Sequence, residues 1–443
     1  MTHRLGMLWI ALRTSLWFVP ALIVTSLVLL AIVLIEVDGR LEPDVFDAWP
    51  RLFGAGAEGT RGMLSTIATA MITVAGVVFS ITIVALSLTS TQYTSRVLRK
   101  FMGDRPSQVV LGAFVGIYAY CLIVLRTIRG PDEGAFVPSL AAIGAIALAF
   151  VGIGLLIHFI HHISSSIQAA HILAAIREET SASIDRLFPE PLGVEQDAPD
   201  VTTSSGASPV PRWTAVHATR TGYIQSVDGD GLIGLACAND LVIRLPHCIG
   251  DFVIEGLPIA QLSGEPANRD ALADKVRGAF TVEDQRTVEQ DAGYGFRQIV
   301  DIALKALSPS TNDPTTATMC LDHLSALLVQ LASRRMPTTD RYAQGRLRLI
   351  SQRATFESLL ALAIEEIRLA AADQPVVLRR VLEVLETVAR AADSRRRPAV
   401  VRHVTRCAAS IGALRDAASR NELAAVAAGV LQELGDPAAH GGS

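Results

Sequence analysis

Three histidines at the end of an apolar run form the first group of side chains that can bind a metal. In the segment HFIHHI, His158, His161 and His162 are spaced at i, i+3 and i+4, so a helix places His158 and His162 one turn apart on one face. Imidazole binds zinc, copper, iron or nickel, and His158 and His162 are therefore candidate metal ligands. No cysteine or carboxylate stands nearby to complete the shell. A pH-sensitive contact and ordinary histidines at a membrane surface remain alternatives.

Hydroxyl and small side chains form a stripe along a second apolar run. Steps of three, four and seven residues place them on one helix face. Close helix packing is one explanation, because small residues let helices approach and hydroxyls bond to carbonyls. A water-lined path through an oligomer is the other, because hydroxyls replace part of an ion's hydration shell without burying a charge. The pore-lining candidates are Thr66, Thr69, Thr73, Gly76, Ser80, Ser87 and Thr91.

A basic cluster, which we call the collar, follows this stripe. Arg96, Arg99 and Lys100 are spaced at i, i+3 and i+4, so a helix carries their three charges on one side. Anionic lipid head groups at the cytosolic surface are the expected partners. A vestibule that attracts anions is a second interpretation, compatible with the first.

A polar loop, SPSTNDP, interrupts two helical patterns in the second half of the chain. Asp313 is predicted to cap a helix that begins at Pro314. The loop is either a rigid joint or a polar site for an ion, small anion or partner at the helix start. Arg297, Asp301 and Lys305 on the preceding helix could complete such a site, or form an exposed charge ladder. The loop motif comprises Ser308, Pro309, Asn312, Asp313 and Pro314.

The elements that position these residues follow from composition. The 443 residues are 50% hydrophobic and 19% charged, with a mean hydropathy of +0.38, which is too apolar for an ordinary soluble protein. Four stretches are long enough to cross a bilayer as helices. They are roughly Leu8–Ile35, Met63–Leu88, Val109–Ile128 and Ser139–Ile160. We therefore predict a four-helix transmembrane domain over residues 1–180.

Basic residues in the short loops predict the orientation. They concentrate before the first span and between the second and third, which places both termini in the cytosol. The five cysteines agree, because they are odd in number, scattered and free of metal-binding spacing. We expect them to be reduced and buried.

The rest of the chain is predicted to be an α+β soluble domain. Residues 181–212, rich in Pro, Ser, Gly and Asp, are predicted to be a linker. Short β-type runs over residues 213–264, LIGLAC among them, predict a small β-barrel. This module holds no lysine, which excludes the swinging arm of a lipoyl domain. From residue 265 to 443 we predict a helical bundle, with helices over 281–290 and 340–371 among others.

Motifs of catalysis are missing from the sequence. It contains no nucleophile elbow, phosphate loop, HExxH motif or dinucleotide fingerprint, so we expect no enzyme activity and no cofactor. The net charge is −4 and aromatic residues are few, whereas nucleic-acid-binding proteins carry basic patches. We therefore expect no nucleic-acid partner.

Four segments together resemble a known family. They are FSITIVALSLTSTQYTSRVLRKF (79–101), HHISSSIQ (161–168), TRTGYIQSVD (219–228) and RQIVDIALKALSPSTNDPTTA (297–317). The chain is similar over nearly its whole length to a bacterial family of predicted membrane proteins known as a domain of unknown function, DUF2254. That family's loop pattern reads ALSPGINDPFTA, from which this chain departs at Ser310, Thr311 and Thr315. The resemblance implies the topology, but no activity.

Two functions fit these observations better than an enzyme does. A homo-oligomeric ion channel or pore would use the hydroxyl stripe, the collar and a large cytosolic domain. A membrane-anchored sensor or scaffold would use the same soluble domain without transport. The sequence leaves both open.

Overall fold

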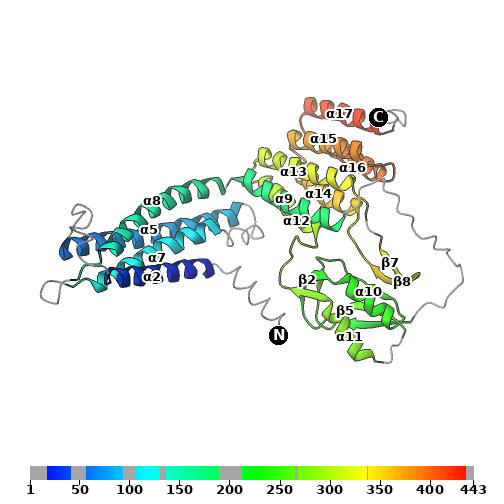
Figure 1. The fold of residues 1–443 in the computed structure, drawn as a ribbon. Helices are drawn as coiled ribbons and strands as arrows, with labels where there is room; N and C mark the ends of the chain where they lie inside the picture. The colour runs from blue at the N-terminus through cyan, green and yellow to red at the C-terminus, as the bar shows by residue number, and fades with distance from the viewer. Residues whose placement is uncertain are drawn as a thin grey trace. The chain divides into compact units, whose positions relative to one another are not determined.

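The computed structural model describes residues 17–40, 56–92, 105–129, 136–166, 168–188, 212–264, 268–336 and 338–435. The chain divides into two compact units, Met1–His171 and Ile172–Ser443. We call them the membrane unit and the soluble unit. In Figure 1 the first runs from blue to cyan-green and the second from green to red. The predicted boundary at residue 180 and the start of the predicted linker fall within helix α9 (Ala169–Leu187).

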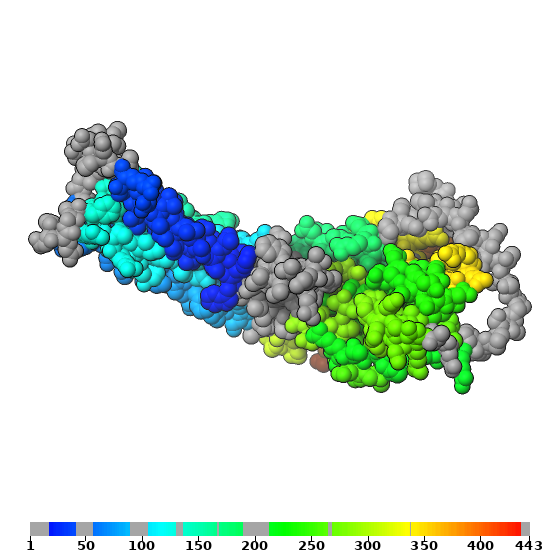
Figure 2. All heavy atoms as spheres, turned by 60° about the horizontal axis from the view of Figure 1, so that its bottom comes forward, coloured from blue at the N-terminus to red at the C-terminus, as the bar shows by residue number. Residues whose placement is uncertain are grey.

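The membrane unit contains four helices that are long and apolar enough to cross a bilayer, as predicted. They are α2 (Phe18–Asp38), α5 (Ala57–Gln92), α7 (Arg105–Thr127) and α8 (Ser139–Ser166). α7 is the most buried of the four, and its core side chains include Phe114, Ile117 and Tyr120. Figure 2 shows α2, in dark blue, along the surface of this unit.

Two glycines let α2 approach α7 closely. Gly112 and Gly116 form a GxxxG pattern on α7, the spacing that allows helix backbones to meet inside a membrane. A Cβ atom added at Gly112 would lie 2.7 Å from the Cα atom of Pro20 on α2, and one at Gly116 would lie 2.6 Å from Leu27 Cδ1. The contact between α2 and α7 therefore depends on the absence of a side chain at these two positions.

A buried carboxylate at the end of α2 caps the start of α8. Asp38 accepts hydrogen bonds from the backbone N–H groups of Leu140 and Ala141, each at 3.0 Å, which satisfies donors that a helix start leaves unpaired. Tyr120 on α7 donates its hydroxyl hydrogen to the carbonyl oxygen of Ala141 at 2.7 Å. Three helices are thus joined at one point.

The soluble unit combines two sheets with helices. Its larger sheet has the order β1-β5-β3-β8-β7, and its smaller one the order β4-β2-β6. Strands β3 and β8 are parallel, whereas the other pairs are antiparallel. The strands are β1 (Trp213–His217), β2 (Gly222–Val227), β3 (Ile243–Leu245), β4 (Phe252–Val253), β5 (Pro258–Ser263), β6 (Phe280–Glu283), β7 (Asp340–Ala343) and β8 (Arg346–Ser351).

The predicted small β-barrel is wrong, because the described strands form open sheets and not a closed barrel. The run LIGLAC, predicted to be a strand, lies in helix α10 (Gly229–Ala238). Asp228 starts this helix by accepting a hydrogen bond from Gly231 N at 2.9 Å. Strands β6, β7 and β8 come from beyond residue 264 and complete the two sheets, so residues 213–264 alone do not hold all their strands.

Helices make up most of the remainder, as predicted. They are α11 (Arg269–Gly278), α12 (Ala292–Ala306), α13 (Pro314–Ala332), α14 (Phe356–Ala370), α15 (Pro375–Ala391), α16 (Arg397–Ile411) and α17 (Ala417–Gly435). Their apolar faces are buried against one another. The helix predicted over 281–290 is instead part of β6 and a loop, and the first part of the one predicted over 340–371 is the hairpin β7–β8. Gln344 and Gly345 turn this hairpin with positive φ angles of 54° and 71°.

Candidate functional site

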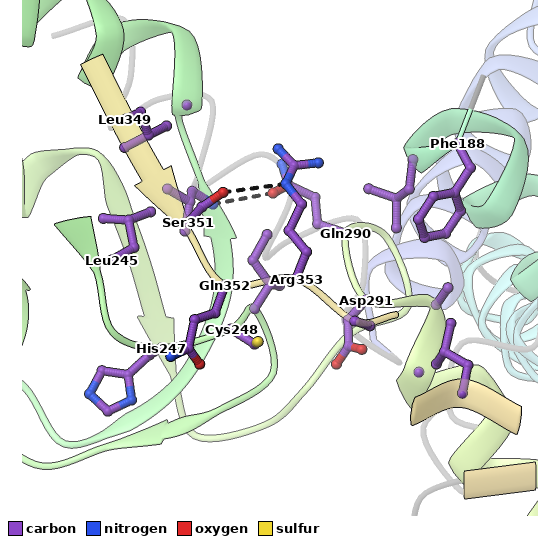
Figure 3. Close-up of a pocket in the computed structure, with 18 of the residues that line it drawn as sticks. Phe188, Leu245, His247, Cys248, Gln290, Asp291, Leu349, Ser351, Gln352 and Arg353 are labelled. Carbon is purple, nitrogen blue, oxygen red and sulfur yellow. Dashed lines mark hydrogen bonds between the residues drawn. The ribbon is translucent and has the colours of Figure 1, made fainter. Parts of the chain in front are cut away.

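A pocket of about 200 Å³ lies in the soluble unit, where the parallel strands β3 and β8 end (Figure 3). Leu245, the last residue of β3, is in register with Ser351, the last residue of β8. Ligands of open sheets with parallel strands bind beyond the carboxyl ends of those strands. The place of the pocket therefore follows a general rule, although only one strand pair here is parallel.

The pocket wall is largely apolar and comes from distant parts of the chain. Figure 3 shows Phe188, at the end of α9, on the opposite side of the pocket from the strand residues Leu245 and Leu349. Gln290 is tied to the wall, because its Oε1 atom accepts a hydrogen bond from Val227 N at 3.2 Å. Apolar walls with a few placed polar groups are typical of small-molecule sites.

Two arginines border the pocket, and they differ in their partners. Arg341 on β7 donates to Asp230 Oδ1 at 3.1 Å. Arg353, two residues after β8, donates through Nε to Ser351 Oγ at 3.4 Å and forms no ion pair with the residues that the structure describes. Burial first and the positive charge of Arg341 second lower the pKa of Arg353.

The carboxylate in the pocket wall is already neutralised. Asp291 caps α12 by accepting from Tyr294 N at 3.1 Å, and Arg286 donates to its Oδ2 atom from Nη2 at 2.6 Å and from Nε at 2.9 Å. Burial raises the pKa of Asp291, an effect that Arg286 opposes. Gly250, at φ +94°, leaves room for this carboxylate, because a Cβ atom there would lie 2.3 Å from Asp291 Oδ2.

His247 and Cys248 complete the polar edge of the pocket. His247 Nε2 lies 3.1 Å from the carbonyl oxygen of Pro258, and Cys248 N donates to Asp251 Oδ2 at 2.8 Å. Burial, followed by the charge of Asp251, raises the pKa of the Cys248 thiol. Because the thiolate is the reactive form, Cys248 is a poor nucleophile here.

The predicted stripe lies on the outward face of α5. The side of α5 that packs inside the membrane unit carries Leu64, Ala68, Met71, Ala75 and Val78. At 100° per residue the stripe lies on the opposite side of the helix. The structure describes the burial of six stripe residues, and all six are exposed in the single chain: Thr66, Thr69, Thr73, Gly76, Ser80 and Ser87.

Two of the exposed hydroxyls on α5 are bonded within their own helix. Thr66 Oγ1 donates to Gly62 O at 2.8 Å, and Thr73 Oγ1 donates to Thr69 O at 2.7 Å. Packing inside the membrane unit therefore does not explain the stripe, and a pore stays a prediction. The side chain of Thr91 and the whole collar, Arg96, Arg99 and Lys100, lie outside the described residues.

The candidate metal ligands His158 and His162 lie together on α8. Their rings are stacked, with centroids 6.2 Å apart. Among the residues that the structure describes, no group of three or more His, Cys, Asp or Glu side chains has the arrangement of a metal site. Metal binding by this pair stays a prediction.

The SPSTNDP loop joins α12 to α13. Asp313 accepts from Thr316 N at 3.0 Å and from Thr316 Oγ1 at 2.6 Å, and Pro314 is the first residue of α13. Asn312 adopts a left-handed φ of 46°, and its Oδ1 atom accepts from Gln374 Nε2 at 2.9 Å. These contacts are those of a structural joint.

Two of the three charged residues that could have completed an anion site at this loop, Arg297 and Asp301, pair with each other, whereas Lys305 forms no ion pair with the residues that the structure describes. Arg297 pairs with Asp301 at 2.8 Å and with Glu366. Because both carboxylates lie beside Arg297, its charge is already balanced. A binding role for Ser308, Pro309 and the rest of the motif stays a prediction.

The pocket residues were not found from the sequence. The signal that was available is the alternation RLRLI at residues 346–350, which is typical of a strand. With β8 assigned, Arg353 would have been placed just beyond a strand end. His247 and Asp291, which line the same pocket, come from other parts of the chain, and no local pattern connects them with Arg353.

Comparison with known proteins supports the resemblance seen in the sequence. The model of the family described as "Predicted membrane protein (DUF2254)" matches residues 13–387. Uncharacterized proteins of Mycobacterium bovis and Mycobacterium tuberculosis are 36% identical over 349 residues, which cover 77% of this chain and 66% of each relative. No solved structure matches the chain. The chain is a member of the DUF2254 family of predicted membrane proteins.

Proposed function

We propose that the protein is a membrane-anchored sensor that binds a small molecule in the pocket of its soluble unit. The observation that carries this proposal is the position of α9. Leu187 and Phe188, at the end of α9, line the pocket, and α9 starts at Ala169, directly after the last membrane helix ends at Ser166. A ligand that contacts Phe188 therefore touches the helix that leads out of the membrane.

The pocket has the properties that ligand binding requires. Its volume of about 200 Å³ exceeds the ~30 Å³ share of one water molecule and suits a small metabolite better than a drug-sized ligand, for which ~300–1,000 Å³ is typical. Its wall joins α9, both sheets and the starts of α12 and α14, so a bound molecule can shift the balance between arrangements of these elements.

The proposed setting is a bacterial inner membrane with both termini and the soluble unit in the cytosol. The basic residues of the short loops support this orientation, and anionic lipids are the proposed partners of the collar. The raised pKa of Cys248 favours binding over covalent catalysis. We propose no enzyme activity and no cofactor.

Affinity selection of metabolites tests the sensor. The full-length protein in detergent is incubated with a bacterial metabolite extract, and retained compounds are identified by mass spectrometry. We expect at least one metabolite to be enriched on the wild type and lost in Ala354→Trp, which fills the pocket. Ala413→Trp, on an exposed loop elsewhere in the soluble unit, is the matched control. Equal retention by both variants, or no enrichment at all, would contradict a ligand-binding pocket.

A homo-oligomeric channel or pore is the second candidate function. The exposed stripe on α5 favours it, because a face opposite the packed side of a helix is free to meet another copy or line a path for ions. A ligand in the soluble unit could gate such a channel, so the two functions are compatible. Conductance of the purified protein in planar bilayers separates a channel from a sensor without transport.

A further inference from the structure

We infer that the ligand of the soluble-unit pocket is a small carboxylic acid with an apolar body, whose carboxylate is bound by Arg353. This inference rests on the proposed sensor function and adds the chemical class of the ligand. It follows from the free hydrogen-bond donors, the charge balance and the apolar wall of the pocket.

The free donors belong to Arg353. Its Nε atom bonds to Ser351 Oγ, while neither terminal nitrogen has a hydrogen-bond partner among the residues that the structure describes. The bond at Nε orients the guanidinium group, and the two terminal nitrogens then form the planar pair of donors that binds a carboxylate with two parallel hydrogen bonds. Arg353 is an exposed residue that also lines the pocket, so its terminal nitrogens can bond to water or to a ligand in the pocket.

The charge balance favours a ligand with one negative charge. Arg286 is paired with Asp291, and Arg341 is paired with Asp230, whereas Arg353 has no carboxylate partner in the described part of the chain. One positive charge is left over. A monoanion compensates it, whereas a dianionic phosphate ester would leave one negative charge without a partner in the largely apolar pocket.

The helix starts near the pocket do not supply an anion site of their own. α10 and α12 both begin at the pocket, but each is capped by its own aspartate. Asp228 accepts from Gly231 N at 2.9 Å, and Asp291 accepts from Tyr294 N at 3.1 Å. Arg353 is therefore the group that selects the anion.

The pocket wall determines which body the ligand can have beside its carboxylate. Phe188, Leu245, Leu349 and Leu359 contribute apolar surface to the pocket, and apolar surface favours a hydrocarbon body because burial removes it from water. A cavity of about 200 Å³ limits that body to a short branched chain or a single ring. Benzoate, phenylacetate and isovalerate have this composition and serve as probes.

Thermal shift and calorimetric titration of the full-length protein in detergent test the inference. We expect at least one of the three acids to stabilise the wild type, and the matching neutral amide, such as benzamide for benzoate, to bind at least about tenfold more weakly because it lacks the charge-assisted hydrogen bonds. Arg353→Gln should weaken the acid at least about tenfold without weakening the amide. Arg415→Gln is the control, because the Arg415 side chain is 90% exposed and lies outside the pocket.

Each of the other outcomes contradicts one part of the inference: the negative charge of the ligand, its single charge, its place in the pocket or its chemical class. An amide that binds as tightly as its acid excludes an anionic ligand, and phenyl phosphate binding more tightly than benzoate excludes a monoanion. An acid that still binds to Ala354→Trp lies outside the pocket. If none of the three acids binds, the class is wrong, while a neutral metabolite retained in the affinity selection would still support the sensor.

Discussion

The outward face of α5 and the pocket of the soluble unit both carry polar groups that are exposed in the single chain. The two regions differ in whether these groups already have hydrogen-bond partners in the protein. On α5, the hydroxyls of Thr73 and Thr66 bond to carbonyls of their own helix, so these two side chains can contact lipid, water or another copy at little cost. In the pocket, the terminal nitrogens of Arg353 bond to none of the described residues. A hydroxyl that is bonded within its own helix tolerates many environments, whereas a guanidinium group without protein partners requires water or a ligand.

The largest loss of stability is expected from a substitution at Gly112, where the backbones of α7 and α2 are in contact. Gly112→Leu should lower the unfolding free energy of the full-length protein by ~3 kcal/mol or prevent folding, because any Cβ atom there meets Pro20 Cα. Gly76→Leu on the stripe is the matched control, since a Cβ atom at Gly76 meets nothing within 4 Å, and its change should stay within about 0.5 kcal/mol. Thermal unfolding in detergent measures both. Equal losses would show that the outward face of α5 is packed as tightly as the face of α7.

The second-largest loss of stability is expected from Glu365, a charged residue with several partners in the helical part of the soluble unit. Glu365 pairs with two arginines, Arg368 at 2.6 Å and Arg406 at 2.8 Å, and lies 2.8 Å from Nδ1 of the buried His403. Burial acts to raise the pKa of Glu365, but the hydrogen bonds from the two arginines outweigh it and lower the pKa to about 2. Glu365→Gln should cost roughly 1.5–3 kcal/mol at neutral pH, because hydrogen bonds between charged groups are lost.

The lowered pKa of Glu365 also predicts that the stability of the protein depends on pH. The contribution of Glu365 is fully present above its ordinary pKa of 4.5 and is lost as pH falls toward about 2. Denaturant titrations at several pH values should therefore show a smaller difference between wild type and Glu365→Gln as the medium becomes acidic. A difference that stays constant down to pH 2 would contradict the role given to these ion pairs.

If the protein is a channel, substitutions on the outward face of α5 should change its conductance but hardly change its stability. If this face lines a pore, Ser80→Leu should reduce conductance in planar bilayers while changing the unfolding free energy by less than about 1 kcal/mol. Thr73→Cys and Ser80→Cys should react with small water-soluble thiol reagents, and Ala75→Cys, on the buried side of α5, should not. Unchanged conductance in Ser80→Leu and unreactive cysteines at the stripe would assign the face to lipid or to another copy.

The smallest change in stability is expected at the pocket. Arg353→Gln should alter the unfolding free energy of the ligand-free protein by no more than about 0.5 kcal/mol, since Arg353 has no ion pair to lose among the described residues and its neighbour Arg341 carries the same charge. Thermal unfolding without ligand measures this. A loss comparable to that of Glu365→Gln would make Arg353 a structural residue and remove the contrast with α5.

The features that the sequence predicted are those carried by single segments. The four membrane helices, the start of α13 at Asp313 and Pro314, and the spacing of the α5 stripe each depend on local composition and period. The pocket could not be predicted in this way, because the pairing of β3 with β8 across about a hundred residues brings its two strand ends together. The barrel prediction failed for the same reason, since it counted strands within one stretch.

The cap that Asp38 provides for α8 has a mechanical consequence. Asp38 holds the first turn of α8 through Leu140 and Ala141. Phe159, in the last third of the same helix, is 1% exposed in the core of the membrane unit. Because α8 is held both at its start and in its last third, we expect it to move with the other helices of this unit as one body and not to tilt alone.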